Sequence, residues 1–360
     1  MRSATGGNVA MKALEREWKG PPGQMDGPVQ NWEPIKGLLP YESSWVAAVD
    51  GPDKAQGKRG HRLSAATIET IRGLWLGPCG TSEPDLKPVE SCHAGHFHCY
   101  RTSLRGKGEV VFRAWREQSG GSPVWSCSSL REAGHRYSWT RHPAGSFEQL
   151  GAALQCAMSS RDELLTNVVC RKILDWGGVR DREDAARIDW LDEQTRRGSL
   201  ISSIQSATRA LRASSTTPLD GLFARDAIPM TSGTTKIFAA AALDFSAGWS
   251  APTQDVLIFD GRVTAALGLI ARRVSHAVPK AFRFPASRES KRRRDPSCAH
   301  LTFPNLHLIS NLERAQFARL GARCIEQVVG KSDFLLAEKA LFMVGYDVRN
   351  LCDGEPRSCS

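Results

Sequence analysis

The sequence predicts a mostly α-helical protein, in which an irregular N-terminal region precedes a helical domain. Beyond about residue 137, apolar residues recur at the three- and four-residue spacing of amphipathic helices. Before that point the chain is interrupted by Gly-Pro pairs and holds few sustained periods. We therefore expect an irregular region over residues 1–136, a helical domain over 137–348 and a tail over 349–360.

The composition indicates a globular protein with a basic balance. The chain has 360 residues, of which 41% are hydrophobic, and this length allows two domains. A net charge of +10 favours a polyanion as partner, and nucleic acid is the polyanion we expect. No apolar run reaches the ~20 residues of a membrane span, and the N-terminus lacks a signal peptide's apolar segment. We expect a cytoplasmic protein that does not enter membranes.

The N-terminal region offers two elements and one motif. Its periodicity predicts a short helix over 65–76 and a short strand over 109–115. Residues 92–99 then place five potential metal ligands in one cluster, with Cys92, His96, His98 and Cys99 as the candidates. Zinc ligands usually come as two pairs separated by a longer loop, which favours a surface loop with incidental His and Cys over a structural zinc site.

The helical domain is predicted from its apolar stripes and its turn residues. Helices are expected over 146–158 and 162–176, over 182–212 as one helix or as two broken near Gly198, and over 312–329 and 333–345. The ten cysteines are spread along the chain without an export signal, so we expect reduced thiols. Cys156, Cys170 and Cys324 fall in apolar helical patterns and are predicted to be core residues.

The central stretch, residues 230–273, contains two helix starts joined by a loop. Ser232-Gly233-Thr234 is a turn and cap signal, and an alanine-rich helix is predicted over 236–245, beginning at or beside Lys236. An apolar run over 256–259 then leads to Asp260, which stands where an N-cap belongs.

A lysine and an aspartate at helix starts have complementary chemistry. The positive end of the helix dipole disfavours an ammonium group and favours an anion, so Lys236 is expected to tend toward a neutral amine while Asp260 stays ionised. Such a pair can attack an electrophilic carbon and stabilise the developing positive charge. The alternatives are a solvated lysine and an aspartate that serves only as a cap.

This stretch resembles the core of helix-hairpin-helix DNA glycosylases of the 8-oxoguanine glycosylase type. The resemblance rests on Gly233-Thr234-Thr235-Lys236-Ile237, the alanine-rich helix and the apolar run that ends in Asp260. It implies that Lys236 is the Schiff-base nucleophile and Asp260 the catalytic carboxylate, with no cofactor and with DNA as partner. The further candidates for DNA contacts are Ser232, Gly233, Thr234, Thr235 and Arg262.

A basic run follows the central stretch and supplies the remaining candidates for DNA contacts. These are Arg288, Lys291, Arg292, Arg293 and Arg294. Such runs neutralise phosphates without reading sequence, although a solvated loop gives the same pattern. We therefore expect a DNA-binding protein that resembles a base-excision glycosylase, with a possible abasic-site lyase step. The alternatives are a catalytically silent nucleic-acid-binding module, such as a component of a defence system, and a zinc-stabilised interaction protein.

Overall fold

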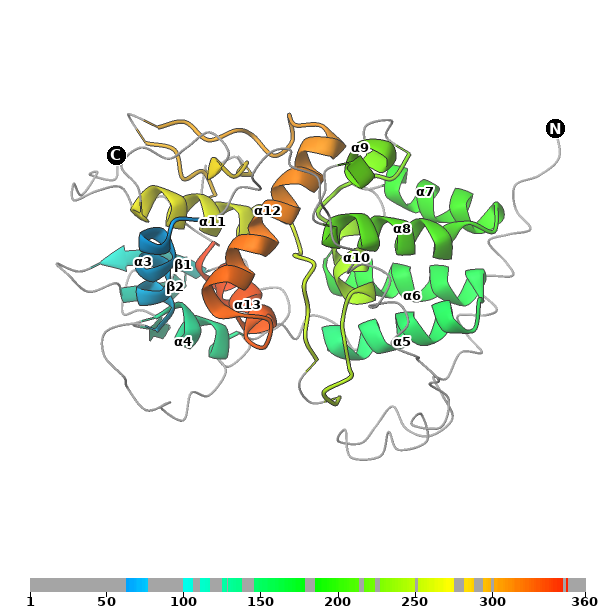
Figure 1. The fold of residues 1–360 in the computed structure, drawn as a ribbon, viewed down its shortest axis with the longest axis horizontal. Helices are drawn as coiled ribbons and strands as arrows, with labels where there is room; N and C mark the ends of the chain where they lie inside the picture. The colour runs from blue at the N-terminus through cyan, green and yellow to red at the C-terminus, as the bar shows by residue number, and fades with distance from the viewer. Residues whose placement is uncertain are drawn as a thin grey trace. The chain divides into compact units, whose positions relative to one another are not determined.

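The structure is a computed structural model, and the chain is mostly helical where it is described (Figure 1). The described residues are 63–76, 100–105, 111–116, 125–127, 129–137, 146–178, 185–213, 217–223, 227–249, 252–274, 282–287, 294–298, 301–345 and 348. All of them belong to one compact unit, Gly60–Ser360, and the other unit, Met1–Arg59, lies outside the described residues.

Most of the elements follow the sequence-based expectation, whereas the helices over 130–135 and 217–223 and the strands over 100–105 and 125–127 were not predicted. The helices are α3 (Ala65–Leu76), α4 (Leu130–His135), α5 (Phe147–Ser159), α6 (Glu163–Trp176), α7 (Ala185–Arg196), α8 (Leu200–Arg212), α9 (Thr217–Phe223), α10 (Thr234–Ala241), α11 (Gly261–Val274), α12 (Asn311–Val329) and α13 (Phe334–Val344). The strands are β1 (Tyr100–Arg105), β2 (Val111–Arg116) and β3 (Trp125–Cys127).

Several of these helices start at capping residues. Ser146 and Gln149 form a capping box at the start of α5, and the Asp162 carboxylate accepts a hydrogen bond from Leu165 N at the start of α6. The charged segment that follows forms two helices, α7 and α8. Gly198 separates them with a φ of +65°, a left-handed conformation that glycine adopts at little cost.

One group of helices surrounds α10. Helices α5, α6 and α8 all pack against α10, which lies among them in Figure 1. The residues of α10 from Thr234 to Ala240 are all buried, because its alanines let neighbouring backbones approach from several sides. Gly151 of α5 makes one such approach, since a Cβ there would lie 3.0 Å from the carbonyl oxygen of Ala240. The alanine-rich run is therefore an interior helix.

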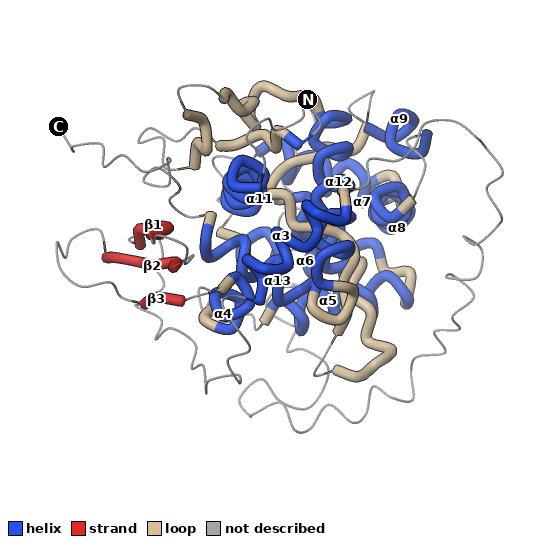
Figure 2. Tube along the Cα trace, turned by 60° about the vertical axis from the view of Figure 1, so that its left-hand side comes forward, coloured by secondary structure: helices blue, strands red, loops and turns tan. Residues whose placement is uncertain are grey.

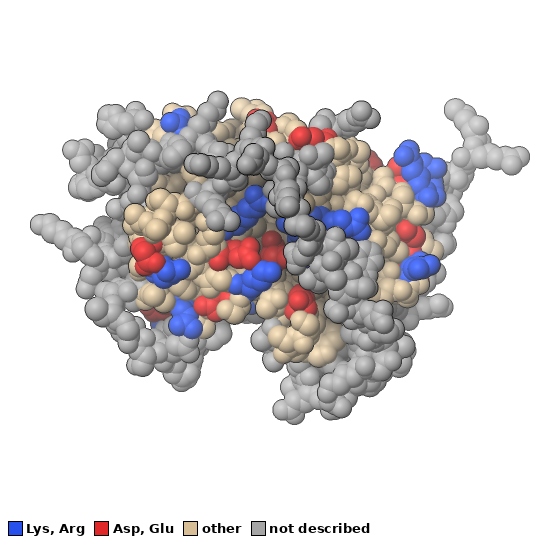
Figure 3. Space-filling model, viewed as in Figure 1, with Lys and Arg blue, Asp and Glu red and all other residues tan. Residues whose placement is uncertain are grey.

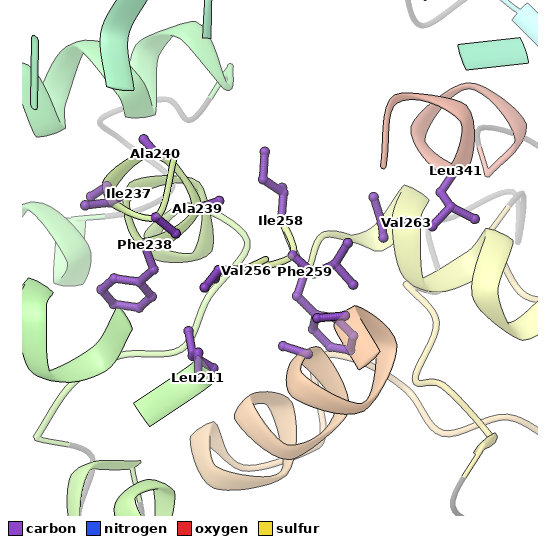
Figure 4. Packing of buried hydrophobic residues seen from close by; sticks show 14 of the residues in the cluster. Leu211, Ile237, Phe238, Ala239, Ala240, Val256, Ile258, Phe259, Val263 and Leu341 are labelled. Atoms are coloured by element: carbon purple, nitrogen blue, oxygen red, sulfur yellow. The ribbon is translucent and has the colours of Figure 1, made fainter. Parts of the chain in front are cut away.

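A second group consists of α3, α4, α11 and α13, and α12 contacts members of both groups. The extended segment that precedes α11 connects α10 to this second group. Figure 4 shows Val256, Ile258 and Phe259 of this segment in the buried space between α10 and α11. The strands form one antiparallel sheet in the order β1-β2-β3, beside α4 (Figure 2). The predicted strand over 109–115 appears as β2.

Two details differ from expectation. The helix predicted over 236–245 begins two residues earlier and ends at Ala241, because the chain turns at Ala242 and Asp244 pairs with Thr253 through two backbone hydrogen bonds of 2.8 and 2.9 Å. Cys156 was predicted to be a core residue and is exposed, whereas Cys170 and Cys324 are buried as predicted. Cys156 lies at the edge of the apolar stripe of α5, and the elements that pack on this stripe leave the Cys156 side chain exposed.

Candidate catalytic site

Lys236 lies in the first turn of α10, and a reciprocal threonine cap fixes the start of that turn. Thr231 N donates to Oγ1 of Thr234 over 2.9 Å, and Thr234 N donates to Oγ1 of Thr231 over 3.2 Å. The Lys236 Nζ turns back toward this cap and donates to the carbonyl oxygen of Ser232 over 2.7 Å. The predicted position of the lysine at a helix start is thus observed.

Asp260 is the N-cap of α11 and also faces the lysine. Its Oδ1 accepts from the backbone N–H groups of Arg262, at 2.9 Å, and Val263, at 3.0 Å. Its Oδ2 lies 4.0 Å from Nζ of Lys236. The two side chains are only 7% and 12% exposed, so the pair sits where water screens its charges weakly. Two residues far apart in the sequence therefore form one cluster.

Hydrogen bonds to side chains of two helices hold the segment that leads to Asp260. The hydroxyl of Thr235, next to Lys236 on α10, accepts from Phe259 N over 3.2 Å. On the other side, Oε2 of Glu338 in α13 accepts from Ile258 N over 2.6 Å and from Nε2 of Gln254 over 3.0 Å. The position of the Asp260 carboxylate relative to the amine is therefore set by α10 and α13 together.

The buried acid beside this segment has an altered titration. Burial raises the pKa of Glu338 to about 8, and the charge of Asp260 adds to the rise, although the hydrogen bonds from Ile258 and Gln254 act in the opposite direction. Burial also raises the pKa of Tyr137 well above its ordinary value, with Glu148 and Glu338 contributing. Because the pKa of Glu338 is about 8, its carboxyl group is protonated near neutral pH and adds no second negative charge close to Asp260.

Charged and aromatic groups of α5, α11 and α13, and Tyr137 just after α4, adjoin the site. The Arg262 guanidinium carbon lies 4.2 Å from the centre of the Phe342 ring, and Nζ of Lys339 lies 2.9 Å from Oε1 of Glu148. The rings of Tyr137 and Phe342 meet edge to face, with their centres 5.7 Å apart. On the face drawn in Figure 3, acidic and basic side chains of the described residues lie side by side near the centre.

Arg262 and the residues at the start of α10 that were candidates for DNA contacts are engaged within the protein. Gly233, Thr234 and Thr235 are buried, and Ser232 is half-buried. Thr234 Oγ1 donates to the carbonyl oxygen of Pro229 over 2.6 Å, and Arg262 is only 4% exposed. These side chains build the site and leave little surface for a phosphate contact.

Of the basic run, only Arg294 falls within the described residues. Its Nη1 would lie 3.5 Å from a Cβ placed on Gly261, so the guanidinium is beside the residue that follows Asp260. The other members, Arg288, Lys291, Arg292 and Arg293, lie outside the described residues, as do the zinc candidates Cys92, His96, His98 and Cys99. Across the ranges that are described, no group of three or more His, Cys, Asp or Glu is placed to hold a metal ion.

Sequence reasoning missed Glu338 and Gln254. Glu338 stands between core residues of α13, and the spacing Leu335, Glu338, Leu341 was the available signal, because an acid on an apolar stripe needs a buried partner. Gln254 gave no signal, since its role depends on a contact with a residue far along the chain.

No protein-family model, curated protein or solved structure matches this chain. Among the helices that the structure describes, none has the length and apolar character needed to cross a membrane.

Proposed function

We propose that this chain is a DNA-binding protein of the helix-hairpin-helix glycosylase type, which removes a base by breaking its bond to deoxyribose. The observation that carries the proposal is the distance of 4.0 Å between Nζ of Lys236 and Oδ2 of Asp260. These two residues, each at a helix start, match the nucleophile and the catalytic carboxylate of the family that the chain resembles. The turn that leads into α10, closed by hydrogen bonds between Thr231 and Thr234, supports the proposal as the counterpart of the hairpin in that class.

The proposed reaction uses one nucleophile and one carboxylate. The target nucleotide is flipped out of the duplex, and the bond from the sugar C1′ to the base breaks with its electron pair leaving on the base. Asp260 stabilises the positive charge that develops on the sugar, and Nζ of Lys236 forms a new bond to C1′. The amine must lose a proton when this bond forms, and the nearby Asp260 carboxylate accepts that proton.

A catalytically silent nucleic-acid-binding module is the second candidate, and one observation favours it. The Lys236 amine is already hydrogen-bonded to the Ser232 carbonyl oxygen, and the lysine is only 6% exposed. A structural ion pair would have the same features, because its amine is also buried and contacts a carbonyl group and a carboxylate. The two functions differ in whether this pair must open to admit a sugar.

An excision assay separates the two candidates. Duplexes that each carry one oxidised, alkylated or mismatched base are incubated with the protein, and hot alkali then reveals any abasic site. We expect release of one class of base by the natural sequence, and loss of release in Lys236→Gln and Asp260→Asn. Lys331→Gln and Asp255→Asn are the matched controls, because each removes the same charge outside the site. Equal activity in the site variants and the controls would contradict the proposal.

A further inference from the structure

Gly177 lies directly against the side chain of Lys236. It follows the last residue of α6, and a Cβ placed on it would lie 2.4 Å from Cδ and 2.6 Å from Cε of the lysine. Its φ of −72° and ψ of −1° are right-handed values that any residue adopts. Backbone conformation therefore does not explain a glycine here. The aliphatic part of Lys236 occupies the space that a side chain at this position would take.

The path of the Lys236 side chain shows why its contact with Gly177 matters for the position of the amine. Lys236 starts on a buried helix, and its two neighbours Thr235 and Ile237 are 1% and 0% exposed. The side chain crosses the end of α6 at Gly177 and then reaches both the Ser232 carbonyl oxygen and the Asp260 carboxylate. Its far carbons have to pass over a residue without a side chain to reach that point.

We propose that Gly177 is a positioning residue: by lacking a side chain, it leaves the channel through which the Lys236 amine reaches Asp260. Gly177→Ala would close that channel at Cδ and Cε, which are the mobile end of the lysine. The least costly response is a change of lysine rotamer that carries the amine away from Asp260, while the backbone stays in place. The placement of the amine is a statement about structure, and its catalytic consequence rests on the proposed function.

Two other glycines provide matched controls. A Cβ on Gly151 of α5 would also meet a side chain at 2.4 Å, but that side chain is Leu243, with the carbonyl oxygen of Ala240 at 3.0 Å. A Cβ on Gly73 of α3 would meet nothing within 4 Å. Gly151→Ala thus applies a clash of the same closeness to a core leucine, and Gly73→Ala changes a helical glycine without any clash.

The first experiment measures amine placement without DNA. The full chain is treated with formaldehyde and cyanoborohydride, and mass spectrometry gives the rate of methylation at Lys236 relative to Lys331, whose side chain is 68% exposed. We expect a low ratio in the natural sequence, a ratio several-fold higher in Gly177→Ala, and no rise in Gly151→Ala or Gly73→Ala. An unchanged ratio in folded Gly177→Ala, or an equal rise in Gly151→Ala, would overturn the proposal.

The second experiment remains decisive if Gly177→Ala fails to fold. Lys236→Ala removes the two carbons that would clash, so Gly177→Ala should lower the thermal unfolding midpoint in the natural background and have little effect in the Lys236→Ala background. Recovery of folding in the double variant is the same result in stronger form. An equal loss in both backgrounds would show that the glycine serves something other than the lysine.

Neither measurement depends on base excision, so the placement can hold even if the proposed enzyme activity fails. If the activity holds, Gly177→Ala should lose base release while duplex binding is retained.

Discussion

The Asp260 carboxylate caps α11 with one oxygen and faces the Lys236 amine with the other, at 4.0 Å. Capping and catalysis were alternative interpretations of this residue in the sequence, and the geometry allows both at once. The cap hydrogen bonds hold the carboxylate in place, so its second oxygen is oriented toward the amine without further side-chain ordering.

Asp260→Asn should separate these two roles. Asparagine keeps an oxygen that can cap α11, so we expect a loss in unfolding free energy of at most ~1 kcal/mol, together with loss of base release. Denaturant unfolding and the excision assay measure the two effects. Asp162→Asn is the matched control, because Asp162 caps α6 in the same way. If both variants lose stability equally and both retain base release, Asp260 is a cap only.

Glu338 should make stability depend on pH. Its pKa is raised by burial from an ordinary value of 4.5 to about 8, so the folded protein binds this proton more tightly than the unfolded chain does. The resulting stabilisation is complete below about pH 4.5 and is lost as the pH rises through about 8.

Glu338→Gln should remove that dependence, because its amide oxygen can still accept from Ile258 N and carries no charge at any pH. Relative to the natural sequence, we expect the variant to gain stability steadily from pH 5 to about pH 8 and to gain no more above it, which denaturant unfolding across that range would measure. Parallel curves for the two proteins would contradict the raised pKa.

The thiols should differ sharply in reactivity. Alkylation by iodoacetamide requires a thiolate, and burial raises the pKa of Cys324 to about 12 and that of Cys170 further still. Cys156 is exposed. We expect mass spectrometry of the native protein to find rapid alkylation at Cys156, with the other two modified only after denaturation. Early modification of Cys170 in folded protein would contradict the buried packing of α6.

The basic run should control the salt dependence of DNA binding. Each phosphate contact contributes roughly 0.9 to the slope of log affinity against log salt, so changing Lys291, Arg292 and Arg293 to Gln should flatten the slope by about 2.7. Fluorescence anisotropy at several salt concentrations measures it. A control with the same loss of charge changes Arg196, Arg197 and Lys331, whose side chains are 71%, 62% and 68% exposed. Equal slopes in the two triple variants would show that the run makes no phosphate contacts.

The sequence predicted the helices well because their signals are local. Apolar stripes and turn residues such as Gly198 each act within one or two turns, and they placed most boundaries within two residues. The Lys236 and Asp260 positions at helix starts were likewise readable from turn and cap residues.

The parts that sequence reasoning missed depend on contacts between distant segments. Glu338 is tied to Gln254 and Ile258, and Gly177 is tied to Lys236, across separations that no local pattern reports. The exposure of Cys156 likewise depended on which neighbours cover α5. The fold class is therefore predictable from local periodicity, whereas the lining of the site follows only from the packing of α6, α10, α11 and α13.

The central claim is that the Lys236 amine reacts at a sugar carbon, and borohydride trapping tests it most directly. A duplex with one abasic site is incubated with the protein and sodium borohydride, and denaturing electrophoresis then shows any covalent complex. The account predicts a crosslink that maps to Lys236, and none in Lys236→Gln, with duplex binding retained in both. A crosslink of equal yield in Lys236→Gln, or none in natural protein that is saturated with the abasic duplex, would contradict it.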